Sequence, residues 1–443
     1  MRIPLSSHFT YKKLFYFCLS PIIMMVFTSI YGVVDGFFVS NYVGKVPFAA
    51  INLVMPFIMI LGGVGFMIGT GGSALIAKSL GEGKQEKANQ YFSMLVKLTA
   101  VLGILLSVIG IAVMRPVSYL LGATEATIED CVVYGRSVLL FNAAFMLQNV
   151  FQTFLAAAEK PKLGLVFTTA AGIANMVLDA LFIVVFQWGV AGAAIATGIG
   201  QCIGGLLPLL YFFRPNGSRL RLVKCQADAR AILKACANGS SELMSNISSS
   251  LISVLYNLQL LKFAGENGVA AYGTIMYVQF IFIAIFIGYT IGTAPIISYH
   301  YGAGNHKELK NLLRKSLLIV STAGASMMVI AWVLAGPLSN IFVGYDTELY
   351  ELTKHAFRMF AFSFLLAGVN IFCSSFFTAL NNGAVSAAIS FMRTLVFQII
   401  SVLLLPVFFG LDGIWYSITV AEVLAFGISL LFLVLNRRNY HYS

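Results

Sequence analysis

Charged residues are scarce in this sequence: they make up only 10% of its 443 positions, whereas 59% are hydrophobic and the mean hydropathy is +0.88. This composition lies outside the usual range of soluble domains. The chain also lacks the alternating ten-residue pattern of membrane strands and carries long apolar runs instead. In lipid such runs form helices, because their backbone groups find partners only within the segment. We therefore predict an all-α integral membrane protein.

Two kinds of site motif are missing. The six cysteines show no CxxC spacing, so we interpret them as small buried thiols rather than metal ligands or disulfides. The loops that begin at Gly81 (GEGKQEK) and Gly302 (GAGNHKE) lack the GxxxxGK[ST] spacing of a phosphate loop and look like helix ends capped by glycine. We expect no cofactor, no resident metal and no catalytic residue, so the chain is not predicted to be an enzyme.

The apolar runs predict twelve membrane spans, an arrangement in which the chain ends on the side where it began. The predicted spans are 14–39, 51–77, 91–114, 132–157, 163–186, 190–213, 236–261, 269–297, 312–335, 356–380, 384–408 and 412–435.

The basic residues indicate the orientation of these spans. Twenty lysines and arginines fall on the side of the two termini, and six fall on the other side, namely Lys45, Arg115, Arg136, Lys262, Lys354 and Arg358. The positive-inside rule then predicts a multi-pass protein of the cell membrane with both termini in the cytoplasm. The net charge of +11 is explained by this topology, and we expect the bilayer rather than nucleic acid as the partner.

The sequence repeats itself at an offset of 221 residues. Gly44 aligns with Gly265, Gly81 with Gly302, and the glycines at 189 and 192 with those at 410 and 413. Because each unit holds six spans, the second copy enters from the same side as the first. We predict two parallel six-helix lobes around a central cleft, with an amino-terminal lobe at 1–213, a cytoplasmic linker at 214–234 and a carboxy-terminal lobe at 235–443.

A small polar set stands out in the first lobe. Asn175 and Asp179 lie one helical turn apart, a turn follows at Gln187 to Gly189, and Thr197 lies in the returning helix. Asp179 and Thr197 are each about nine residues from that turn, hence at a similar depth of roughly 13 Å. Asp35, near the outer end of the first span, completes the set. The residues that correspond to this polar set at the 221-residue offset are not acidic, so the predicted site exists in one lobe only.

An ionisable group within a span is a candidate functional site, because it is costly to bury in hydrocarbon. Two carboxylates brought together in a medium of low dielectric constant cannot both stay charged, so they titrate as a unit. Such a pair takes up a proton or a small cation, and the oxygens of Asn175 and Thr197 suit Na⁺ as well as H⁺. The alternative is that each group bonds a neighbouring backbone in a rigid bundle.

For the other polar residues within spans, the sequence leaves two possible roles open. Arg393 and Glu422 are expected to form a structural ion pair, with a substrate or coupling role as the alternative. Glu242 attracts a cationic substrate in the cleft or is solvated near its helix start. Gln148, Asn149, Gln152 and Asn257 line the cleft or bond across helices. Pro21 removes a backbone hydrogen bond from the first span and can kink it, either statically or as a moving bend.

These features together resemble the multidrug and toxic compound extrusion (MATE) family of cation-coupled antiporters. The resemblance rests on VVDGFFVSNYVG followed by AAINLVMP, on GEGKQEKAN, and on N-x₃-D followed by GVAGAAIAT. The pattern is most similar to the bacterial branch with acidic residues in helices 1 and 5. The resemblance implies that Asp35, Asn175, Asp179 and Thr197 form a cation site, that Pro21 is the bend point of helix 1, and that the cleft holds amphipathic cationic drugs.

We therefore expect an antiporter that exports organic cations in exchange for H⁺ or Na⁺, with no obligate protein partner. Three alternatives carry less weight. A lipid-linked oligosaccharide flippase would need several basic residues in its cleft, where only Arg393 lies at depth. An intramembrane aspartyl hydrolase would give no reason for a duplicated body. A major-facilitator transporter would carry a basic signature between spans 2 and 3 that this chain lacks.

Overall fold

The computed structural model describes residues 3–442, so the outermost residues of the two predicted lobes, 1–2 and 443, lie outside the described part. That part is mainly helical and contains no strand. Its α-helices and π-helices (η) are α1 Tyr11–Phe38, η1 Val39–Val43, α2 Lys45–Gly81, α3 Gln85–Leu120, α4 Ile128–Leu139, α5 Asn142–Ala157, α6 Pro161–Asp179, η2 Ala180–Val185, α7 Gly189–Phe213, α8 Ala229–Gly302, α9 His306–Val343, α10 Thr347–Ala361, α11 Phe364–Ala379, α12 Gly383–Phe391, η3 Met392–Val396 and α13 Phe397–Tyr440.

Twelve membrane-crossing segments follow from these helices in the described residues. The pairs α4–α5 and α10–α11 are each one span bent between its two helices, by 56° and 47°. The 74 residues of α8 contain two spans separated at Gly265, and the 58 residues from Gly383 to Tyr440 contain two spans separated at Gly410. The prediction of twelve spans is confirmed.

Glycines at matching positions set the chain reversals in both copies of the repeat. Gly265 and Gly410 have φ values of 61° and 59°, and their counterparts Gly44 and Gly189 have φ values of 127° and 58°. A residue with a Cβ atom rarely adopts such backbone angles, whereas glycine does so readily. The offset of 221 residues seen in the sequence therefore appears as the same backbone reversal at the same place in each copy.

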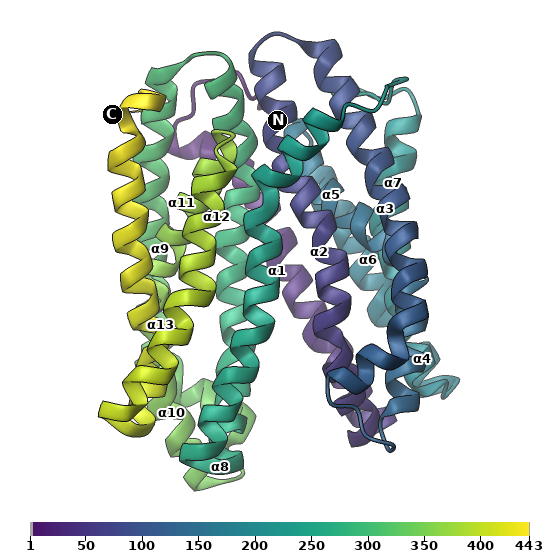
Figure 1. Cartoon of the computed structure of the whole chain (residues 1–443), viewed down its shortest axis with the longest axis vertical. Coiled ribbons are helices and arrows are strands. Elements are labelled where there is room, and N and C mark those ends of the chain that lie inside the picture. Colours follow the sequence, from purple (N-terminus) through teal and green to yellow (C-terminus); the bar gives the residue numbers. More distant parts are fainter. Residues whose placement is uncertain (1–2, 443) are drawn as a thin grey trace.

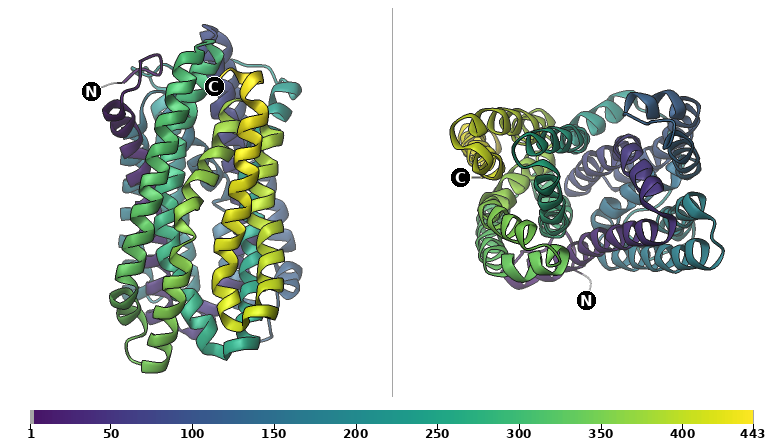
Figure 2. Two further views of the ribbon diagram at one scale, coloured as in Figure 1. Left: turned by 90° about the vertical axis from the view of Figure 1, so that its left-hand side faces the viewer. Right: turned by 90° about the horizontal axis from the view of Figure 1, so that it is seen from below.

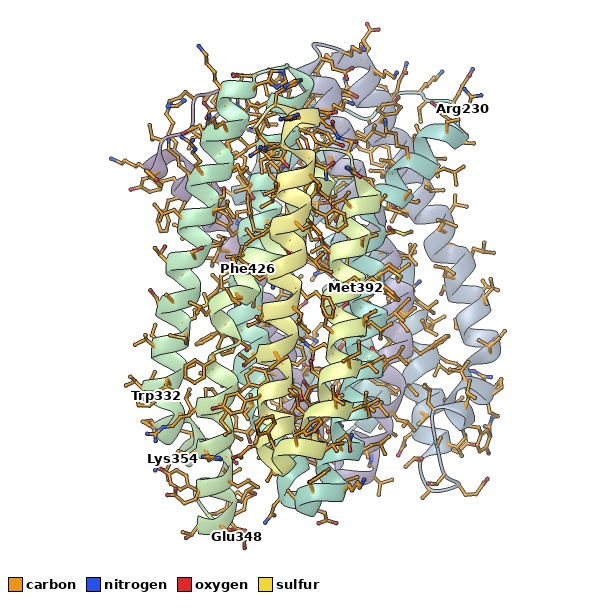
Figure 3. The ribbon with its side chains drawn as sticks, turned by 60° about the vertical axis from the view of Figure 1, so that its left-hand side comes forward. Arg230, Trp332, Glu348, Lys354, Met392 and Phe426 are labelled. Atoms are coloured by element: carbon orange, nitrogen blue, oxygen red, sulfur yellow. The ribbon has the colours of Figure 1, made fainter. Side chains whose placement is uncertain are left out.

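The helices form two groups that lie side by side, α1 to α7 in one and α8 to α13 in the other (Figures 1 and 2). The core of the second group includes Leu14, Phe17 and Cys18 from the first turns of α1, which pack with the buried side chains of α8 and α9. Figure 3 places Arg230, at the start of α8, at the opposite end of the bundle from Lys354 and Glu348 of α10.

The two groups contact each other closely at the end that carries both chain termini. Gly81, the last residue of α2, lies against Tyr299 and Ala303 at the end of α8, and Gly302 in turn lies against Lys78. From there α2 and the first span of α8 diverge toward the end that holds α4 and α10 (Figure 1). The groups are therefore joined at the terminal end and apart at the other.

The segment before α1 ties the two groups together at the terminal end. The backbone N–H of Leu5 donates to Glu159, after α5, at 3.0 Å, and that of Phe9 donates to Glu308 of α9 at 2.9 Å. His8 Nδ1 lies 2.6 Å from the second oxygen of Glu308, and the side chains of Leu5 and Phe9 are fully buried. This segment therefore bridges the groups by hydrogen bonds and by apolar packing.

The linker between the groups is shorter than predicted and lies on the first group. The helix α8 begins at Ala229, so the last six residues of the predicted linker are helical. The side chain of Asp228 accepts from the N–H groups of Arg230 and Ala231 and caps this helix. The N–H of Val223 donates to Ser93 of α3 at 2.8 Å, so the linker is held against that helix.

Candidate functional site: a pair of interacting aspartates

Both predicted aspartates lie where an α-helix changes into a π-helix. Asp35 is in the last turn of α1, directly before η1, and Asp179 is the last residue of α6, directly before η2. Such π-turns occur often at functional sites because they disturb the regular backbone hydrogen bonds. The chain then reverses at Gln187 and Gly189, both with positive φ, as the sequence predicted.

The carboxyl groups of Asp35 and Asp179 lie close enough to each other to interact electrostatically. Asp179 is fully buried. Among the described residues, no donor reaches either carboxylate oxygen of Asp179 or Oδ1 of Asp35. Buried acceptors without donors are costly, so this arrangement favours a proton or a cation shared between the two acids.

The two neutral residues of the predicted set are adjacent to each other. The side-chain amide of Asn175 donates to the hydroxyl of Thr197 at 3.5 Å, the outer limit of a hydrogen bond. Asn175 is 3% exposed, and its carbonyl oxygen has no donor in the described part of the chain. Asn175 thus adds an acceptor oxygen one helical turn from Asp179, which suits a proton relay or a hard cation.

Two tyrosines near the acids were missed in the sequence analysis. Tyr134 of α4 is almost fully buried and interacts electrostatically with both Asp35 and Asp179. Tyr31 of α1 lies one turn before Asp35 and interacts electrostatically with it. The spacing of Tyr31 and Asp35 was visible in the sequence, but Tyr134 comes from a span that carried no other signal for this site.

Three of the side chains that the sequence placed either in the central cleft or in contacts between helices are buried in the first group. Gln148, Asn149 and Gln152 are at most 5% exposed and pack between helices of the first group. The amide of Asn149, for example, donates to the carbonyl oxygen of Gly62 at 3.1 Å. Their position follows from the tight approach of α2, α5 and α7, and it matches the alternative that they bond across helices.

The other two predicted cleft residues are half-buried on α8. Asn257 lies in its first span, and Glu242, one turn before Asn246, interacts electrostatically with Arg393. Pro21 is buried within α1, which is one continuous helix here, and its carbonyl oxygen lies beside Gly288 of α8.

The expected ion pair between Arg393 and Glu422 is present in the second group. Arg393 donates through two nitrogens, at 2.8 Å and 2.9 Å to one carboxylate oxygen, and Asn370 donates to the other at 2.7 Å. Ser429 then donates to the amide oxygen of Asn370 at 3.1 Å. Glu422 is 3% exposed. This closed network satisfies the buried charges, as a structural pair requires.

Comparison with known proteins places these features in a family context. The family model MatE matches residues 21–181 and 243–404. The chain is 24% identical over 432 residues to the multidrug export protein MepA of Staphylococcus haemolyticus, which covers 97% of this chain and 94% of that protein.

Solved structures share the fold. One described as MATE in complex with MaL6 has a TM-score of 0.93 at 20% identity. Another, described as the outward-facing conformation of a multidrug resistance MATE family transporter, has a TM-score of 0.92 at 21% identity. Each covers 98% of both chains, so the likeness extends over the whole fold.

Proposed function

Because the chain belongs to the MATE family, we propose that it is a cation-coupled antiporter that exports amphipathic, mostly cationic organic compounds across the cell membrane. Asp35 and Asp179 take up the coupling ion, H⁺ or Na⁺, with Asn175 and Thr197 as neutral oxygen donors beside them. Glu242 and Asn257 line the path of the organic cation, and Pro21 is the bend point of α1. The duplicated twelve-span body and the multidrug export relatives support this proposal.

The observation that carries the proposal is the interaction of the buried Asp179 with the half-buried Asp35, at a place where three of their four carboxylate oxygens are buried without a donor. A purely structural acid is expected to bond a neighbour, as Glu422 does with Arg393 and Asn370. The pair Asp35 and Asp179 has no such neighbour among the described residues. It therefore needs a proton or a cation for its stability, which is the property of a coupling site.

The conformation of the molecule fits the step of an exchange cycle in which the coupling ion enters from outside and the organic cation is released. With both termini in the cytoplasm, the close contacts of α2 with α8 shut the cytoplasmic side, and the diverging ends face outward. In this state the coupling ion binds the acids, favours release of the organic cation, and promotes return to the inward-open form. Coupling requires that the ion bind the two states with different affinity.

The driving force depends on the stoichiometry. Exchange of one proton for one monovalent organic cation moves no net charge, so the pH difference alone drives it, at about 1.4 kcal/mol per pH unit. The membrane voltage contributes about 2.3 kcal/mol per 100 mV only if a second coupling ion moves.

The test is ethidium transport in proteoliposomes under an imposed pH or Na⁺ gradient. We expect Asp35→Asn and Asp179→Asn each to abolish gradient-driven flux, because an amide cannot exchange a proton or neutralise a cation. The matched control is Asp130→Asn, which changes an acid of the same group at the start of α4. Gradient-driven flux that survives in both site variants would refute the coupling role.

Two alternatives predict other outcomes. A lipid-linked oligosaccharide flippase needs basic groups for pyrophosphate, but Arg393 is already bonded to Glu422, so we expect no gradient-independent flipping of such a lipid. An aspartyl hydrolase would cleave a peptide without any ion gradient. Cleavage that is lost in Asp35→Asn and Asp179→Asn would favour the hydrolase.

A further inference from the structure

A cavity of about 310 Å³ lies at the seam between the two helix groups. One wall is α1 of the first group, with Phe15, Cys18 and Ile22, and the facing wall comes from α8 and α9 of the second group, including Phe286 and Ala323. Its volume is at the lower end of the range for pockets that bind small ligands. The seam is where the two groups would have to move relative to each other.

The lining of this cavity is apolar. The hydroxyl of Tyr289 bonds Ser316 at 2.9 Å, so this polar group of the lining is already satisfied. Water enters a cavity only where several polar groups can bond it, and this lining does not provide them. Phe15 is 54% exposed at the edge of the cavity, on the outer surface of the helices. In a membrane that surface meets hydrocarbon, so lipid chains have access to the cavity.

Positive charge lies at the terminal end of the same cavity. The ammonium group of Lys315 is 2.7 Å from the carbonyl oxygen of Phe9 and 5.2 Å from the ring of Tyr11, which lines the cavity. Lys315 is one helical turn before Ile319, another lining residue. The ammonium group of Lys13 lies 3.3 Å from the carbonyl oxygen of His8.

Neither of these two ammonium groups is neutralised by another residue that the structure describes. No carboxylate of the described residues forms an ion pair with Lys13 or Lys315. The nearby acid, Glu308, is held by His8 and by the N–H of Phe9. An anionic group at this position would therefore meet two lysines without a competing partner, next to an apolar cavity.

We propose that the seam cavity binds one acyl chain of an anionic phospholipid, whose phosphate is held by Lys315 and Lys13. The chain occupies the space between α1, α8 and α9, and the headgroup lies at the membrane surface on the side of the termini. A bound lipid fills the seam in the observed state and thereby favours it over a state in which α1 moves away from α8. This site is separate from Asp35 and Asp179 and does not depend on their role in coupling.

The experiment uses the full chain in phosphatidylcholine nanodiscs with a trace of photoactivatable phosphatidylglycerol, which carries a diazirine in its acyl chain. A phosphatidylcholine probe with the same chains serves as the comparison, and cross-linked peptides are mapped by mass spectrometry. We expect labelling in 15–22 and 319–323. With about a fivefold gain per lysine near the surface, the anionic probe should label these segments at least about fivefold more strongly.

Single-residue variants distinguish the contribution of the cavity to lipid binding from that of the lysines. Ala323→Trp fills the cavity and should remove the labelling, whereas Ala325→Trp, the same change outside the lining, should leave it. Lys315→Gln should lower the preference for the anionic probe about fivefold without abolishing labelling by either probe. The label map of the native chain tests the proposal even if a tryptophan variant does not fold.

Three results would overturn the proposal. Equal labelling by both probes would remove the role of the lysines. Labelling that is unchanged in Ala323→Trp would show that the chain binds elsewhere. Displacement of the label by ethidium but not by unlabelled phosphatidylglycerol would identify the cavity as a drug site rather than a lipid site.

Discussion

Replacing Gly81 by alanine should push the two helix groups apart at the terminal end. A Cβ at Gly81 would lie 2.9 Å from the backbone nitrogen of Ala303 and closer still to the carbonyl oxygen of Tyr299, whereas ordinary contacts begin at 3.4 Å. The neighbours are backbone atoms and cannot rotate away, so α2 and α8 must separate by about 1 Å or more. Gly81 lies in α2 with ordinary helical backbone angles, where alanine is a better helix former than glycine. Only the contact with α8 therefore opposes the substitution by alanine.

The size of the effect follows from the cost of overpacking, about 1–3 kcal/mol. If the inward-open state lacks this contact, the equilibrium between the observed state and the inward-open state shifts toward the latter. A cost of about 1–3 kcal/mol corresponds to a shift of about 5- to 150-fold. Gly427→Ala is the matched control, because a Cβ at Gly427 on α13 meets no atom within 4 Å.

The shift can be measured as a distance between the far ends of the two groups. Spin labels at Leu120, the last residue of α3, and Tyr345, before α10, are suitable because these side chains are 86% and 83% exposed. We expect Gly81→Ala to add a population with a shorter separation between the labels. A distance distribution for Gly81→Ala that equals that of Gly427→Ala would refute the idea that this contact holds the observed state.

Two further predictions concern polar groups outside the proposed coupling site. Arg393→Met should destabilise the protein by about 3–5 kcal/mol in denaturant unfolding, because Glu422 becomes an uncompensated buried charge, whereas the double variant with Glu422→Met should recover most of the loss. Burial raises the pKa of Glu308, but hydrogen bonds from Phe9, His8 and Asn311 outweigh it and hold the pKa below its ordinary value. The stability from Glu308 is therefore present at neutral pH and is lost as the pH falls below about 4. In thermal unfolding from pH 7 to pH 3, Glu308→Gln should lose less stability than the native chain, and an equal loss would contradict this assignment.

Much of the fold was predictable because membrane insertion imposes simple rules on the chain. Twelve long apolar runs needed twelve helices, and the 221-residue offset already paired Gly44 with Gly265 and Gly189 with Gly410. What the hydropathy pattern did not contain were the bends within the fourth and tenth spans and the three π-helices. These depend on local backbone bonding and on neighbouring helices, which leave no periodic signal in the sequence.

The part of the candidate site that consists of charged residues was predictable, because a charged residue within an apolar span is easy to recognise. Asp35 and Asp179 stood out because acids are rare in apolar spans. Tyr134 did not, since a tyrosine within a span is unremarkable until the fold brings it beside the two acids. For Gln148, Asn149 and Gln152 the sequence left open whether they line a cleft or bond across helices, because polarity alone does not tell which face of a helix is covered by its neighbours.

By itself the amino-acid sequence determined the helical membrane class, the number of spans, the duplication and the two acids, since each depends only on composition or spacing along one chain. Tertiary structure alone decided that Asp35 and Asp179 lie close enough to interact, that the groups are joined at the terminal end, and that an apolar cavity remains between α1, α8 and α9. These three features arise where helices distant in sequence pack, and packing depends on side-chain shapes that meet only in the folded molecule.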